Sequence, residues 1–221
     1  LEPPSGGAIE LDGRDLATLK GRDAVRIHRD VQMMFQDSYA AMDPRMRIDQ
    51  ILAEPMSIQK TGNRRQIAER IMEIIEQVGL TEEILDRYPH EFSGGQLQRI
   101  MIAMALLNDP ALLIADEPTT ALDVTIQAEI LDLLHDLQKQ MGMAIIFITH
   151  DLGLAEHYAE TVCVMKDGEI VERGKIKQVF ANPTHPYTAQ LIHSVPKGMK
   201  DPIEGNPPEL IRADDINVHF T

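Results

Sequence analysis

The fold class of this chain is decided by Leu112-Leu113-Ile114-Ala115-Asp116-Glu117-Pro118, an apolar run that ends in two carboxylates and a proline. Strands buried in a parallel sheet read as unbroken apolar runs, because helices cover both of their faces. Ligands of such sheets bind beyond the carboxyl ends of the strands, where Asp116 and Glu117 would lie. An acid at a strand end can also simply cap the next turn, so the run alone predicts a buried strand and only a candidate site.

A second run, Phe92-Ser93-Gly94-Gly95-Gln96, precedes the first. Glycine has no Cβ, so a pair of glycines lets backbone N–H groups approach a phosphate closely. A helix that opens at this point adds the partial positive charge of its N-terminus. The run therefore predicts a phosphate-binding helix start.

Strand and helix patterns alternate along the rest of the chain, which predicts an α/β fold with a mostly parallel core sheet. Apolar runs predict strands at 8–11, 31–35, 144–148 and 161–165, with a hairpin from the last strand to 169–172. Helical spacing predicts helices at 64–78, 97–107, 125–141 and 187–193. Gly79 is the expected C-terminal cap of the first of these helices.

Composition limits the class of protein. The formal net charge of −14 argues against a nucleic-acid-binding surface, which would need a basic patch. Cys163 is the only cysteine, and its place in an apolar strand predicts a small buried hydrophobe and not a reactive thiol. The sequence holds no apolar run of about 20 residues and no signal-peptide pattern, so we expect any membrane contact to go through a partner.

Taken together, the two runs resemble the signature sequence and the Walker B strand of ABC-type ATPases. Gln36, after the predicted strand 31–35, resembles the Q-loop glutamine. Thr120-Ala121-Leu122-Asp123 resembles the D-loop, and His150 follows strand 144–148 as the H-loop histidine does. The resemblance covers about residues 5–174; Thr120 stands where the family more often has Ser, and Phe92 where it more often has Leu.

This resemblance implies a role for each strand-end residue. Asp116 would hold Mg²⁺ through water, and Glu117 would be the general base or the residue that orients the attacking water. His150 would hydrogen-bond the γ-phosphate and orient the base. Gln36 would contact the metal or the attacking water and sense the transmembrane partner. A lone histidine is usually structural or merely solvated, and it is the strand-end position that favours a function for His150. Taken singly, Gln36 would more often be a surface residue of a loop.

The signature residues have a different target in this family. Ser93, Gly94, Gly95 and Gln96 would bind the ATP held by the opposite subunit of a head-to-tail dimer. Asp123 would lie across the dimer interface. The implied cofactors are ATP and Mg²⁺.

A narrower resemblance points to the ATP-binding subunits of dipeptide and oligopeptide importers. It rests on residues 116–127, on Asn182-Pro183-Thr184-His185-Pro186-Tyr187-Thr188 and on Gly205-Asn206-Pro207-Pro208. The predicted organisation is a partial ATPase core with the Q-loop at 1–44, a helical subdomain at 45–90, and a core with signature, Walker B, D-loop and H-loop at 91–178. A C-terminal extension and linker at 179–208 and the first strand of a following domain at 209–221 complete it.

The Walker A sequence G-x-x-x-x-G-K-[ST] occurs nowhere in the 221 residues. In the family it precedes the segment that resembles residues 1–7, so we expect the N-terminal part of the ATPase domain to be absent. Residues 209–220 suggest a piece of a tandem-domain protein, although they can equally form a terminal edge strand. We expect the chain alone to bind ATP very weakly, to hydrolyse almost none and to expose apolar sheet surface.

The resemblance thus implies an ATP-hydrolysing subunit that powers import of peptides or a related small solute, at the cytoplasmic face of a bacterial or archaeal inner membrane. Expected partners are a second ABC ATPase domain (identical, different or a tandem half), transmembrane permease subunits and, indirectly, a solute-binding protein, but no nucleic acid. The alternative is a non-catalytic module that completes the ATP site of another subunit. A DNA-repair or translation ATPase is disfavoured by the acidic charge and the importer-like tail.

Overall fold

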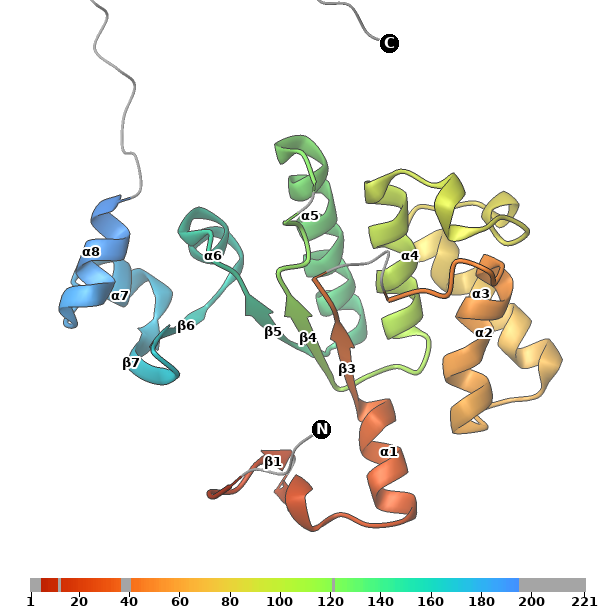
Figure 1. Ribbon diagram of the computed structural model, residues 1–221, viewed down its shortest axis with the longest axis horizontal. Coiled ribbons are helices and arrows are strands. Elements are labelled where there is room, and N and C mark those ends of the chain that lie inside the picture. The colour runs from red at the N-terminus through yellow and green to blue at the C-terminus, as the bar shows by residue number, and fades with distance from the viewer. Residues whose placement is uncertain (1–4, 12, 37–40, 121, 195–221) are drawn as a thin grey trace, which may run out of the picture.

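The structure, a computed structural model, describes residues 5–11, 13–36, 41–120 and 122–194. Its strands are β1 (Glu10–Leu11), β2 (Arg14–Asp15), β3 (Val31–Met34), β4 (Leu112–Asp116), β5 (Ala144–Ile148), β6 (Thr161–Lys166) and β7 (Glu169–Lys175). Its α-helices are α1 (Arg22–Asp30), α2 (Ile48–Gln59), α3 (Arg64–Gln77), α4 (Gly94–Leu106), α5 (Val124–Met141), α6 (Leu152–Tyr158), α7 (Ile176–Ala181) and α8 (Pro186–Ser194). Strands and helices alternate along the chain (Figure 1), which confirms the predicted α/β class.

Strands β3, β4 and β5 form a parallel sheet in that order. Met33 lies beside Ile114, which in turn lies beside Ile146. Because parallel strands end at the same edge, the residues that follow the three strands are brought close together. The predicted parallel core sheet is confirmed, and its carboxyl edge collects Gln36, Glu117 and His150.

The two faces of this sheet differ in their cover. Helices α4 and α5 pack on one face (Figure 1), where Leu113 and Ala115 are fully buried. On the other face Met33, Ile146 and Ile148 are 41, 49 and 45% exposed. Alternate residues of a strand point to opposite faces, so the described part of the chain covers one face of the sheet and leaves apolar surface on the other. The predicted exposure of apolar sheet surface is therefore confirmed.

Helices α2 and α3 pack against α4 and share its core. Helix α3 begins at Arg64 because the Asn63 side chain caps it, accepting hydrogen bonds from the backbone N–H groups of the second and third helical residues at 3.0 and 3.1 Å. The helix ends before Gly79, whose φ of +72° is a left-handed conformation that glycine adopts without strain. The helix and the glycine stop predicted from the sequence are both confirmed.

Strands β6 and β7 form a separate antiparallel hairpin, as predicted. The prediction of a buried Cys163 is wrong, because this side chain is exposed. In β6 only Val164 is buried. A two-stranded hairpin that packs through one face leaves the alternate positions, Cys163 among them, open to solvent.

Glu172 of β7 fixes the segment that leads into α8. Its carboxylate accepts hydrogen bonds from the Thr184 N–H and hydroxyl, both at 2.8 Å, and from the His185 N–H at 3.0 Å. The Thr184 N–H foremost, and next the side chain of Thr188, lower the pKa of Glu172 to about 2, with the His185 N–H and the Thr184 hydroxyl contributing less. The importer-like segment 182–188 is thereby tied to the hairpin, and the helix predicted at 187–193 is present as α8.

Some sequence predictions fall outside the described residues: the start of the run 1–7, residues 37–40 after Gln36, Ala121 of the D-loop-like segment, and the tail with the linker and the strand predicted at 209–221. Within the described ranges, no helix combines the length and the apolar character needed to cross a membrane.

Candidate functional site

Glu117 stands at the turn that follows β4, with its backbone held on both sides. Its φ of +45° lies in the left-handed region, which residues with a side chain rarely adopt. The Glu117 N–H donates to the carbonyl of Ile148 at 2.9 Å, and the Glu117 carbonyl accepts from the Thr120 N–H at 3.3 Å. This unusual conformation is therefore tied both to the end of β5 and to the turn itself, a pattern that is common at functional sites.

The Glu117 carboxylate gathers partners from three segments. Gln36, after β3, donates from Nε2 to Oε2 at 2.8 Å, and the Thr120 hydroxyl donates to the same oxygen at 2.9 Å. His150, after β5, places Nδ1 3.1 Å from Oε1. The structure thus brings together three residues that the sequence predicted separately (Gln36, Glu117 and His150) and adds Thr120, to which the sequence assigned no such contact.

These partners favour the ionised form of Glu117. The pKa of this carboxyl is lowered, first by the hydrogen bond with His150 and next by the hydroxyl of Thr120, with Gln36 contributing less. The Glu117 side chain is 24% exposed, whereas that of His150 is 73% exposed. A partly shielded, ionised carboxylate beside an accessible imidazole can accept a hydrogen bond from a bound water and orient it, although its lowered pKa makes it a weaker base.

Asp116 is the last residue of β4 and is half-buried beside Ile148. In the described part of the chain, no group of three or more His, Cys, Asp or Glu residues is placed to hold a metal ion. Mg²⁺ does not require such a group, because it keeps several waters and takes substrate phosphates beside one or two carboxylates. Gln36 uses its Nε2 on Glu117, so its amide oxygen remains as a second hard donor. These donors fit Mg²⁺ chemically.

The Ser-Gly-Gly run forms the start of α4, with Ser93 as its N-cap. The Ser93 hydroxyl accepts from the Gln96 N–H at 3.4 Å, and the Gln96 side-chain oxygen accepts from the Ser93 N–H at 3.1 Å. This reciprocal cap fixes the helix start. Gly94 and Gly95 lie in the first turn, where backbone N–H groups have no partner within the helix. The predicted helix start is present, and phosphate binding there stays a prediction.

The two glycines also serve a packing role that the sequence did not reveal. A Cβ at Gly94 would lie 3.2 Å from Leu122 Cδ2, and a Cβ at Gly95 would lie 2.8 Å from Ile126 Cγ2. Carbon atoms pack at about 3.5–4.0 Å, so a side chain at position 95 does not fit without a shift. The glycine pair therefore lets α4 approach the start of α5 closely, in addition to any approach to a ligand.

Asp123 acts as the N-cap of α5 in this chain. Its carboxylate accepts a hydrogen bond from the Ile126 N–H at 3.0 Å, and the side chain is exposed. The described contacts of Asp123 are therefore local ones. Its predicted place at a dimer interface is a prediction that a single chain does not test.

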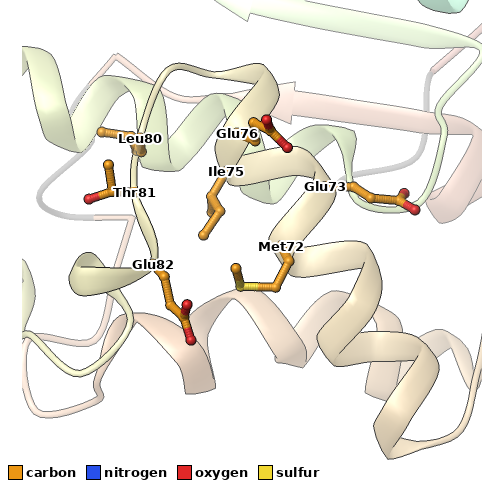
Figure 2. A pocket seen from close by; sticks show the side chains of 7 residues that line it. All are labelled: Met72, Glu73, Ile75, Glu76, Leu80, Thr81 and Glu82. Carbon is orange, nitrogen blue, oxygen red and sulfur yellow. The ribbon is translucent and has the colours of Figure 1, made fainter.

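A hollow on the helical region lies apart from these residues. Figure 2 shows its lining, in which Met72, Ile75 and Leu80 lie with Thr81 and the glutamates Glu73, Glu76 and Glu82. None of the predicted site residues lines this hollow. The candidate site is thus the carboxyl edge of the sheet and not this hollow.

Two family models match the chain. Residues 1–120 match the family described as ABC transporter, which is more than half of the chain. Residues 171–215 match the family described as Oligopeptide/dipeptide transporter, C-terminal region. The second match includes segment 182–188, on which the narrower resemblance rested.

Similar proteins of known name or structure agree with these matches. The chain is 47% identical over 218 residues to the peptidoglycan transport ATP-binding protein YejF of Agrobacterium fabrum, with 97% of this chain and 40% of that protein covered. It is 43% identical over 214 residues to a putative peptide import ATP-binding protein of Brucella ovis, covering 97% of this chain and 67% of the relative. The dimeric, post-hydrolysis structure of the ATP-binding cassette MJ0796 bound to ADP and Pi superimposes with a TM-score of 0.69 at 29% identity, over 79% of this chain and 75% of that one. The chain thus spans less than half of the first relative and about two thirds of the second.

Proposed function

This chain belongs to the ABC transporter family and carries an oligopeptide/dipeptide transporter C-terminal region, and we propose that it supplies the ATP-hydrolysing machinery of a bacterial importer for peptides or a related small solute. The observation that carries the proposal is the Glu117 carboxylate, which is contacted by Gln36 and His150 at the carboxyl edge of the parallel sheet. Family membership alone does not identify a general base; this arrangement of side chains supports one.

In the proposed mechanism Glu117 accepts a proton from the attacking water, or orients that water, as phosphoryl transfer proceeds. His150 keeps the Glu117 carboxylate aimed and has its exposed imidazole free to hydrogen-bond the terminal phosphate of ATP. Asp116 and the amide oxygen of Gln36 are the residues that would hold Mg²⁺. When bound, this ion would neutralise negative charge on the phosphate oxygens.

The start of α4 serves a second nucleotide in this proposal. Ser93, Gly94, Gly95 and Gln96 bind the phosphates of an ATP held by the opposite domain of a head-to-tail dimer, through backbone N–H groups and the helix N-terminus. Asp123, exposed beside this helix start, contacts that opposite domain. Support comes from the capped helix start described above and from the dimeric state of the similar ATP-binding cassette.

The partners follow from the family. We assign the chain a second ABC ATPase domain and transmembrane permease subunits, with a solute-binding protein as an indirect partner, at the cytoplasmic face of the inner membrane. Peptide import is supported by the C-terminal region matched at residues 171–215 and by the names of the relatives. Helices between Arg45 and Tyr88, with the loop of Gln36, would transmit closure of the ATPase dimer to the permease.

These 221 residues on their own are proposed to bind ATP weakly and to hydrolyse almost none. They contain no Walker A sequence, whose lysine and backbone N–H groups make charge-assisted hydrogen bonds to phosphate worth about 1.5–3 kcal/mol each. Losing several of these bonds weakens binding by at least a few factors of ten.

The capped helix start at Ser93 also supports a second candidate function, in which the chain is a non-catalytic partner. Its Ser93–Gln96 segment would complete the ATP site of another domain, and its own carboxylate would have no catalytic role. The two candidates differ in what they require of Glu117.

The test is ATP hydrolysis by the protein that carries these residues, reconstituted with its permease in lipid vesicles and stimulated by peptide-loaded binding protein. We expect Glu117→Gln to lower kcat at least a hundredfold, because general base catalysis contributes about 10²–10⁴-fold. A Ser93→Arg variant, which blocks the start of α4, should also stop hydrolysis. If Glu117→Gln keeps the full rate while Ser93→Arg abolishes it, the non-catalytic candidate is correct and the catalytic one is wrong.

A further inference from the structure

Thr120 is a described hydrogen-bond donor to Glu117 that has no role in the proposed mechanism. Its hydroxyl donates to Oε2 at 2.9 Å, the same oxygen that accepts from Gln36 at 2.8 Å. We propose that Thr120 is a positioning residue for hydrolysis, which fixes the orientation of the Glu117 carboxylate. This inference rests on the proposed role of Glu117 as general base.

Thr120 differs from the other two partners in its place in the chain. Gln36 and His150 follow other strands, and each also has a proposed contact to the metal or to phosphate. Thr120 lies in the same turn as Glu117, and its backbone N–H donates to the Glu117 carbonyl at 3.3 Å. Its hydroxyl therefore reaches the carboxylate from within the same turn, and in the proposed mechanism it contacts neither the metal nor the nucleotide.

One fixed oxygen determines the direction of the other. A carboxylate has about four lone-pair sites, so with Oε2 held by Thr120 and Gln36, the lone pair of Oε1 that His150 does not contact remains to receive a proton from water. Rotation of the carboxylate about its terminal torsion, which is soft in a free Glu side chain, is thereby restricted. Misplacement of a reacting group by about 1 Å can lower a rate a hundredfold, so a single orienting hydrogen bond is kinetically significant.

Threonine suits this role better than serine. Its branched Cβ restricts χ1, so the hydroxyl samples fewer directions than that of serine would. The side chain is exposed, so substitutions that keep its size leave the core undisturbed. Valine has nearly the same shape without the hydroxyl, which makes Thr120→Val the cleanest removal of the hydrogen bond.

The first test compares ATP hydrolysis in the reconstituted transporter. Thr120→Val should lower kcat about tenfold while the KM for ATP stays within twofold, because the residue acts on Glu117 and not on nucleotide binding. Thr120→Ser should keep at least half of the rate, and Thr120→Ala should reproduce the loss if Thr120→Val folds poorly. Thr161→Val, the same chemical change at an exposed position of β6, is the matched control and should keep the full rate.

The second test asks whether Thr120 acts through Glu117. In a Glu117→Gln background, Thr120→Val should change the residual rate by less than twofold, because there is no base left to orient. Without nucleotide, the side-chain amide resonance of Gln36, which shares Oε2, should shift in Thr120→Val and return in Thr120→Ser.

Two results would overturn the inference: a Thr120→Val rate within twofold of wild type, or a tenfold loss that persists in the Glu117→Gln background. Failure of the proposed function looks different. If Glu117→Gln itself keeps the wild-type rate, Glu117 is not the base, whatever Thr120 does.

Discussion

Replacing Gly95 by alanine tests the close approach of the start of α4 to the start of α5. Alanine is favoured over glycine inside a helix by about 0.5–1 kcal/mol, so an uncrowded position would become more stable. At position 95 the new Cβ would instead lie 2.8 Å from Ile126 Cγ2, inside the usual carbon–carbon distance of about 3.5–4.0 Å. Overpacking of this kind costs about 1–3 kcal/mol. We therefore expect Gly95→Ala to lower the free energy of unfolding by about 1–2 kcal/mol.

The assay is urea unfolding of the 221-residue chain, with a double-mutant cycle on Ile126. Ile126→Ala removes the Cγ2 atom, so in that background Gly95→Ala should become neutral or stabilising, with a coupling energy of about 1–2 kcal/mol. Gly153 is a matched control, because it holds the second position of α6 and its added Cβ would meet only the side-chain oxygen of Asp151 at 3.2 Å. Gly153→Ala should leave stability unchanged or raised.

Crowding at Gly95 is refuted if Gly95→Ala is as stable as wild type while Ile126 is present. The same holds if the Ile126→Ala background does not change its effect. In either case the glycine would be required only for the approach of a ligand, as the sequence alone suggested.

Three further predictions concern stability. Glu172 has a folded-state pKa of about 2 against an ordinary value of 4.5, so its stabilising effect is complete above pH 4.5 and is lost as the pH falls toward 2. The unfolding free energies of wild type and Glu172→Gln, measured across this range, should therefore differ at pH 6 and converge at low pH. Asp123→Ala removes the N-cap of α5 and should cost about 0.5–2 kcal/mol in denaturant unfolding, whereas Asp123→Asn should cost only a few tenths. Leu113→Ala, on the covered face of the sheet, should lower the free energy of unfolding by about 2–5 kcal/mol, whereas Ile146→Ala on the open face should lower it clearly less. Equal losses of stability would mean that both faces of the sheet are packed.

The core elements could be predicted because their signals are local. Apolar runs of five residues marked β4 and β5, and helical spacing with a glycine stop marked α3. The burial of Cys163 could not be predicted in this way. An apolar strand pattern does not reveal whether one or both faces of the strand will be covered, and the β6–β7 hairpin leaves one face open.

The candidate site, too, has contacts that the sequence could predict and one that it could not. Glu117 and His150 could be predicted to meet because the ends of neighbouring parallel strands share an edge, which is a rule of topology. The contact from Thr120 could not be predicted, because it depends on the left-handed backbone conformation of Glu117. A glutamate in the sequence does not indicate such a conformation. Thr120 follows Glu117 by three residues, and that spacing, typical of a turn, was the one available signal.

The segment of residues 117–126 contains both Thr120, which donates a hydrogen bond to Glu117, and Ile126, which packs closely against Gly95. Its first residue is the proposed base, and its last fixes the distance between α4 and α5. The proposed mechanism assigns these two ends to different ATP molecules, one facing this chain's own sheet edge and one held by the opposite domain. Leu122 and Ile126 of this segment lie against the glycines at the start of α4. The same segment thus lies between the two ends to which the proposed mechanism assigns different ATP molecules, with the α4 start at one end and Glu117 at the other.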